Sequence, residues 1–122
     1  MSIVYVVGLG PGAGEQMTAQ ARQALEQCSV IAGYTVYIDL IREEFPEKQF
    51  LMTPMRKEAE RCKMALEQAQ QGQDVAMVCS GDAGVYGMAG LMYELKADYP
   101  GVELKIVPGI TAATGGAAVL GA

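Results

Sequence analysis

The sequence of 122 residues contains no histidine and only three cysteines, which lie far apart. A catalytic triad that depends on histidine is therefore excluded, and no pairing of cysteines favours a zinc site. Cys28, Cys62 and Cys79 each fall on an apolar position, which predicts reduced core residues in a cytoplasmic protein. We accordingly expect no metal, and the chemistry must rest on other residue types.

Runs of basic residues and long apolar runs are also missing. The net charge of −5, without a basic cluster, argues against a nucleic-acid partner. The apolar segment 1–7 has no basic flank and is too short for a signal peptide or a membrane span. No repeat, low-complexity tract or linker divides the chain, so residues 1–122 are expected to form a single domain without membrane attachment.

Glycine, by contrast, is abundant, with 15 residues against an average usage of about 7%. Many of these glycines cluster in turns, which suggests that the backbone approaches a ligand closely. Three such turns, at residues 8–12, 80–82 and 108–111, each follow an apolar run that reads as a strand. In open α/β sheets, ligands bind where such turns leave the carboxyl ends of the strands.

Hydrophobic periodicity predicts strands and helices in strict alternation, as in a parallel sheet with crossover helices. The expected strands are residues 3–7, 29–33, 49–52, 74–79 and 102–107. The expected helices are one that starts at an N-cap on Thr18, then residues 34–42, 56–71, 85–95 and 110–120. The fold class is therefore α/β, with a five-stranded, mainly parallel sheet and helices on both faces.

The first turn leaves two interpretations open. Its pattern, Gly8-x-Gly10-x-x-Ala13, matches the permissive dinucleotide fingerprint, which would make the chain a nicotinamide-binding oxidoreductase domain. That fingerprint needs a helix that starts within the motif and an acidic residue after the second strand, and neither is evident here. A P-loop is excluded because no Lys-Ser or Lys-Thr pair follows the glycines.

The other two turns also allow a structural and a functional reading. The carboxylate of Asp82 suits a ligand that is cationic or rich in hydroxyl donors, but it is equally suited to cap the helix that follows. The third turn, around Pro108 and Thr111, allows a ligand to approach the backbone, or simply packs on the sheet. Composition alone does not separate these readings.

Taken together, the three turns resemble the tetrapyrrole (corrin/porphyrin) methylases, which use S-adenosylmethionine. The resemblance rests on the segments Val7-Gly8-Leu9-Gly10-Pro11-Gly12, Ser80-Gly81-Asp82 and Val107-Pro108-Gly109-Ile110-Thr111-Ala112-Ala113. Two further stretches, residues 33–41 and 80–90, are similar to the branch that methylates C17 of precorrin-3B, or of its cobalt form, in cobalamin biosynthesis. In that branch Asp82 is followed by Ala-Gly, where many relatives have proline.

The resemblance implies a role for each turn. S-adenosylmethionine, which leaves as S-adenosylhomocysteine, would be held by the cofactor-binding residues Pro11, Ser80, Gly81, Asp82, Val85, Thr111 and Ala112. The loop formed by Gly8, Gly10, Pro11 and Gly12 would lie on the substrate side, next to the macrocycle. The implied activity is methyl transfer to C17 with contraction of the ring, and no catalytic residue is identified.

The resemblance also implies a larger protein. Family members are about twice as long, so the chain is expected to be the N-terminal half of a two-domain, homodimeric enzyme. The apolar segment 117–122 agrees with this expectation, and it also leaves open a non-catalytic module that serves as an interface. The implied tetrapyrrole substrate carries many carboxylates, for which Arg42, Arg56 and Lys57 are candidate partners or, more simply, solvated surface residues.

Overall fold

The computed structural model describes residues 2–9, 17–54, 57–79 and 82–107, the last of these without the side chains of residues 82–87. The elements alternate as the periodicity predicts. In chain order they are β1 (Ser2–Gly8), α1 (Ala19–Gln27), β2 (Val30–Tyr34), α2 (Thr35–Ile41), β3 (Gln49–Thr53), α3 (Glu58–Gln70), β4 (Val75–Cys79), α4 (Asp82–Leu95), a short 3-10 helix (Lys96–Asp98) and β5 (Val102–Val107).

All five strands form one parallel sheet in the order β3-β2-β4-β1-β5. Strands β4 and β1, which are both rich in apolar residues, are neighbours within this sheet. Every residue of β4 is buried, as expected for a strand covered on both faces. The predicted fold class is therefore confirmed.

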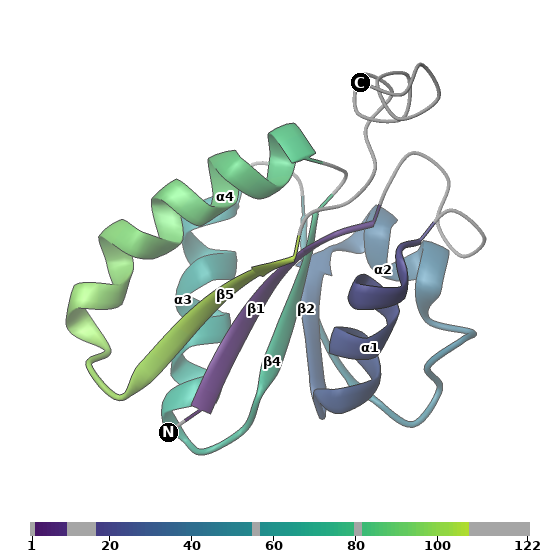
Figure 1. Ribbon diagram of the computed structural model, residues 1–122, viewed down its shortest axis with the longest axis horizontal. Coiled ribbons are helices and arrows are strands. Elements are labelled where there is room, and N and C mark those ends of the chain that lie inside the picture. The colour runs from purple at the N-terminus through teal and green to yellow at the C-terminus, as the bar shows by residue number, and fades with distance from the viewer. Residues whose placement is uncertain (1, 10–16, 55–56, 80–81, 108–122) are drawn as a thin grey trace.

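Helices cover both faces of the sheet, with α3 and α4 on one side and α1 and α2 on the other (Figure 1). Alternate residues of a strand point to opposite faces, so β1 sends Val4 and Val6 toward α3 and α4 and Val7 toward α1 and α2. The sheet thus separates two hydrophobic cores.

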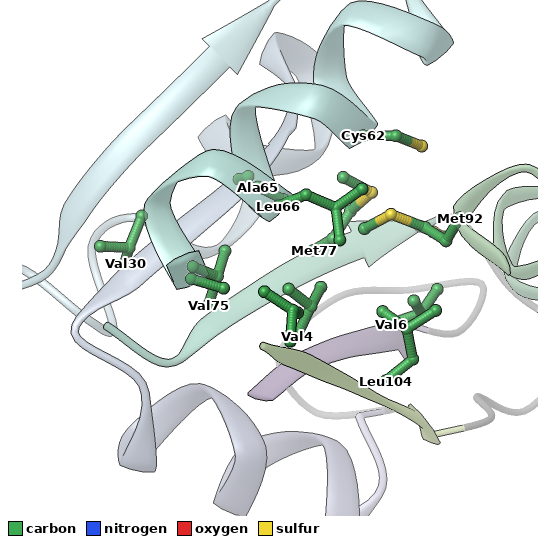
Figure 2. Packing of buried hydrophobic residues seen from close by; sticks show 14 residues of the cluster. Val4, Val6, Val30, Cys62, Ala65, Leu66, Val75, Met77, Met92 and Leu104 are labelled. Carbon is green, nitrogen blue, oxygen red and sulfur yellow. The ribbon is translucent and has the colours of Figure 1, made fainter. Parts of the chain in front are cut away.

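Figure 2 shows the core beneath α3 and α4 at close range. Leu66 projects from α3 toward the sheet and Cys62 toward α4, and Met77 of β4 and Met92 of α4 pack in the same core with Ala65. These five side chains are all fully buried. The side of α3 that carries Cys62, Ala65 and Leu66 is therefore the surface that packs into this core.

Residues with known capping preferences stand at two helix ends, and one of them, Thr18, is predicted. Thr18 caps α1, because its hydroxyl oxygen accepts a hydrogen bond of 3.0 Å from the backbone N–H of Ala21. Gly72 follows α3 with a φ of 104°, the left-handed conformation that ends many helices. Tyr34, predicted at the start of a helix, instead ends β2. The helix predicted over residues 110–120 lies outside the described residues.

The described helices include none that is long and apolar enough to cross a membrane.

Gly33 lies in β2 where a side chain of β4 fills the space beside it. The two strands pair Gly33 with Val78, and a Cβ atom on Gly33 would lie 2.5 Å from the Cγ2 atom of Val78. The Cδ1 atom of Ile38 would be 3.4 Å away on the same side. Because Val78 has a stiff β-branched side chain inside the sheet, the strands have no room for a larger residue at this position.

We predict that Gly33→Ala lowers the free energy of unfolding by about 1–3 kcal/mol, because it overpacks a closed site. Gly90→Ala is the matched control, because Gly90 lies at an exposed position of α4 and a Cβ atom there would meet nothing within 4 Å. Replacing a helical glycine by alanine should stabilise the protein by about 1 kcal/mol. Urea denaturation of both variants measures the difference, and equal effects of the two substitutions would contradict this account.

The three cysteines are buried free thiols, as predicted from their apolar positions. Burial raises the pKa of Cys28 and of Cys79 to about 12 and that of Cys62 to about 11. In the unfolded chain a thiol ionises near pH 8.5. Between that pH and about 11, the unfolded state therefore releases protons that the native state retains.

The expected consequence is a loss of stability as the pH rises above about 9. Below the pKa of the unfolded chain, the thiols make their full contribution to the free energy of unfolding. Above that pH, each thiol lowers the free energy of unfolding by up to about 1.4 kcal/mol per pH unit. Urea unfolding at pH 8 and pH 10 measures the slope. A variant with alanine at all three positions should show a clearly smaller slope, and an unchanged slope would contradict the prediction.

Candidate functional site

The carboxyl ends of three adjacent strands meet at one edge of the sheet. Gly8, the last residue of β1, pairs with Cys79, the last residue of β4, and Val7 pairs with Val107, the last residue of β5. Neighbouring strands lie about 4.8 Å apart, so the three chain segments that follow leave the sheet within roughly 10 Å of one another. These are the three turns that the sequence singles out.

A backbone hydrogen bond extends the pairing of β1 and β4 beyond the strands. The N–H of Leu9 donates to the carbonyl oxygen of Cys79 at 2.9 Å. This bond holds Leu9, the residue after β1, beside the last residue of β4. The side chain of Leu9 is itself buried in the core beneath α1 and α2, which anchors the beginning of the loop.

The same pair of strands is the topological switch point of the sheet. After β1 the chain turns to α1 and reaches β2, across one face. After β4 it turns to α4 and reaches β5, in the opposite direction across the other face (Figure 1). The two connections therefore diverge between β1 and β4, and ligands of doubly wound sheets bind in the crevice that such a divergence opens.

The residues at the ends of these strands are apolar. Val7, Leu9, Val78 and Cys79 are all buried, and the raised pKa of Cys79 keeps its thiol protonated at neutral pH. A neutral thiol is a poor nucleophile. Among the residues that the structure describes, no group of three or more potential metal-ligating side chains occurs. The edge is therefore suited to binding and orienting a ligand and excluding water beneath it.

The structure places only part of the predicted site. Gly8 is the last residue of β1, and Asp82 is the first residue of α4, directly after the turn. The side chains of Asp82 and Val85 lie outside the described part of the chain, as does the alternative capping role of Asp82. The following predicted residues also lie outside it: Gly10, Pro11, Gly12, Ser80, Gly81, Thr111 and Ala112.

The structure gives little support to the dinucleotide fingerprint. Helix α1 begins at Ala19, capped by Thr18, well after Gly10 and Ala13. A dinucleotide site of that kind needs the helix N-terminus directly at the glycines. The residue after β2 is Thr35, which has no carboxylate to bind a ribose.

The sequence interpretation missed a buried charged residue at this edge. Arg61 in α3 is only 5% exposed, and its Nε atom donates a hydrogen bond of 2.7 Å to the hydroxyl of Thr53, the last residue of β3. One signal was available: Arg61 lies four residues before Ala65 and next to Cys62, on the helical face that packs on the sheet.

The basic residues that the sequence did suggest are different in character. Arg42 is exposed and pairs with Asp39 at 3.2 Å, and Lys57 is exposed and pairs with Glu60 at 3.7 Å. Both are ordinary surface ion pairs, which contribute little. Arg56 lies outside the described residues.

The family model for Tetrapyrrole (Corrin/Porphyrin) Methylases matches residues 3–122. A "Probable cobalt-factor III C(17)-methyltransferase" from Salmonella typhimurium is 44% identical over 121 residues, which cover 98% of this chain and 50% of that protein. The chain therefore spans about half the length of this relative.

Solved structures share the arrangement. The methyltransferase CobJ has a TM-score of 0.81 at 38% identity, and the match covers 100% of this chain and 52% of that one. A uroporphyrin-III C-methyltransferase from Thermus thermophilus, in complex with S-adenosylhomocysteine, has a TM-score of 0.72 at 25% identity and covers 91% and 49% of the two chains. Neither the oxidoreductase nor the non-catalytic alternative is supported by these matches.

The parallel sheet with its switch point at β1 and β4 agrees with a match that extends along nearly the whole sequence, and the chain belongs to the tetrapyrrole methylase family.

Proposed function

We propose that the chain is the N-terminal, cofactor-binding half of an S-adenosylmethionine-dependent methyltransferase. Its substrate would be a corrin precursor of cobalamin biosynthesis, precorrin-3B or its cobalt form, methylated at C17 with contraction of the ring. The observation that carries the proposal is the convergence of the three motif-bearing segments at the carboxyl ends of β4, β1 and β5. The name of the Salmonella relative supports the same reaction.

The fit of the cofactor to this edge rests on its chemistry. A parallel sheet presents the crevice at its switch point, and α4 begins at Asp82 directly beside it. A carboxylate at that position suits either the ribose hydroxyls or the positive charge of S-adenosylmethionine. The buried apolar residues at the strand ends, including Val7 and Val78, would keep water away from the side of the cofactor that faces the sheet.

S-adenosylmethionine supplies a methyl group on a cationic sulfonium. Charge disperses as the methyl group is transferred, so this chain's contribution would be to align the reactants and exclude water rather than to provide a strong base. The absence of histidine from the sequence is compatible with such a mechanism. The rigid pairing of Gly8 with Cys79 would fix the two loops whose spacing sets this alignment.

The wider proposal includes the rest of the protein. A second domain would complete the cofactor pocket, the enzyme would be a homodimer, and it would act in the cytoplasm on a tetrapyrrole, without nucleic-acid or membrane partners. The two-domain arrangement is supported by the half-length match to the Salmonella relative.

Calorimetry with S-adenosylhomocysteine on the full-length protein tests the site. We expect binding, and we expect Asp82→Ala combined with Thr111→Val to weaken it at least about tenfold, since each substitution removes a polar contact of roughly 1 kcal/mol or more. Asp98→Ala is the control, because Asp98 is an exposed acidic residue on the connection that enters β5 from its other end. Binding that is absent, or unchanged in the double variant, would refute the site assignment.

A second prediction concerns the separate half. Residues 1–122 alone should not transfer a methyl group from radiolabelled S-adenosylmethionine to a corrin precursor, whereas the full-length protein should. The reason is that the opposite wall of the pocket would belong to the second domain. Incorporation of label by the isolated half, above a blank without protein, would show that this half is sufficient.

A further inference from the structure

Arg61 is a buried guanidinium at the same edge of the sheet as the proposed cofactor site. It is 5% exposed and lies in the first turns of α3. Its Nε atom donates to the hydroxyl of Thr53 at 2.7 Å, and its Nη2 atom donates to the carbonyl oxygen of Pro54 at 3.5 Å. The guanidinium carbon also lies 5.9 Å from the centre of the Tyr34 ring.

No carboxylate neutralises this charge within the described part of the chain. The ion pairs found there join Arg22 to Glu44, Arg42 to Asp39 and Lys57 to Glu60, and none involves Arg61. A guanidinium has five N–H donors, and the described residues accept from only two of them. Burying a positive charge without a negative partner costs free energy, so such a residue calls for an explanation other than stability.

The position of Arg61 relates it to the crevice. Tyr34 and Thr53 are the last residues of β2 and β3, so the guanidinium lies at the carboxyl ends of these strands. Strand β2 is the neighbour of β4, whose last residue is Cys79. The positive charge of Arg61 also acts on the Cys79 thiol, where it offsets part of the pKa rise caused by burial.

The surrounding contacts hold the side chain in place. The hydroxyl of Thr35 donates to the carbonyl oxygen of Thr53 at 3.2 Å, which ties the residue after β2 to the end of β3. Thr53 is itself 3% exposed, so the hydroxyl that accepts from Arg61 is fixed. A guanidinium that is held at Nε presents its remaining N–H groups in a rigid fork, which matches the two oxygens of a carboxylate.

We propose that Arg61 binds a carboxylate of a ligand in this crevice. The inference rests on the proposed function, which offers two sources of that group: the acidic side chains of the tetrapyrrole and the methionyl carboxylate of S-adenosylmethionine. Arg61 lies at the ends of β2 and β3 and not at the ends of β1 and β5, and this position favours the tetrapyrrole. Arg61 is then a substrate-binding residue that orients the macrocycle, with no proton transfer of its own.

The test compares Arg61→Met and Arg61→Lys with the parent in the full-length protein. Steady-state methyl transfer gives the KM for the corrin substrate, and calorimetry gives the Kd of S-adenosylhomocysteine and of 5′-methylthioadenosine, which lacks the carboxylate. We expect Arg61→Met to raise the KM for the corrin by roughly 10- to 100-fold, as for the loss of a charged hydrogen-bonded pair. Arg61→Lys should have a smaller effect, because it keeps the charge and loses the fork.

The two carboxylate sources give different results. If the tetrapyrrole supplies the group, the KM for the corrin rises and both nucleoside affinities are unchanged. If the cofactor supplies it, S-adenosylhomocysteine binds more weakly while 5′-methylthioadenosine does not. A folded Arg61→Met variant with every one of these values within twofold of the parent would overturn the inference. Binding of S-adenosylhomocysteine by the parent protein tests the proposed function separately.

Two further variants guard against a purely structural explanation. Lys63→Met removes an exposed positive charge from the same helix and should leave all the constants unchanged. Removing a buried charge that has no ion pair among the described residues should leave the thermal midpoint of Arg61→Met equal to the parent's or higher. If that variant does not fold, Thr53→Val loosens the guanidinium without removing it and should raise the same constant by a smaller factor; an unchanged constant there would overturn the inference.

Discussion

The pairing of β1 with β4 is the constraint on which the rest of the structure depends. It joins residues about seventy positions apart, and it places two loops that leave on opposite faces of the sheet side by side. The hydrogen bond from Leu9 to Cys79 carries the pairing one step beyond the strands. Both hydrophobic cores are built on these two strands, so the geometry of the crevice is fixed by the most buried part of the molecule.

Much of the fold could be predicted because local and global signals agree. Strands β1, β2 and β4 have continuous apolar runs, and Thr18 and Gly72 mark helix ends by well-understood chemistry. The misplacement of Tyr34 has a physical reason. An aromatic residue that is half-buried fits either a strand end or a first helical turn, and pairing with Thr53 of β3 decides for the strand.

The site was only partly within reach of the sequence. Glycine and proline in the turns reveal where the backbone bends, and the family resemblance supplies the roles. Arg61 was missed because arginine on a helix is normally solvated, and periodicity alone does not show that Thr53 and Tyr34 enclose it. The importance of Gly33 also depends on a neighbour distant in sequence, Val78, and so becomes evident only in three dimensions.

The order of strands has a consequence for how the protein is made. Strand β1 is synthesised before the other four strands of this sheet, yet its neighbours β4 and β5 begin only at Val75 and Val102. An apolar strand with both edges unpaired must therefore wait for more than half of this sequence to be synthesised. Pairing across such separations is slow, and the exposed strand is a site where chains can associate wrongly. The position of β1 between two strands that are made much later therefore makes it the strand most in need of protection during synthesis.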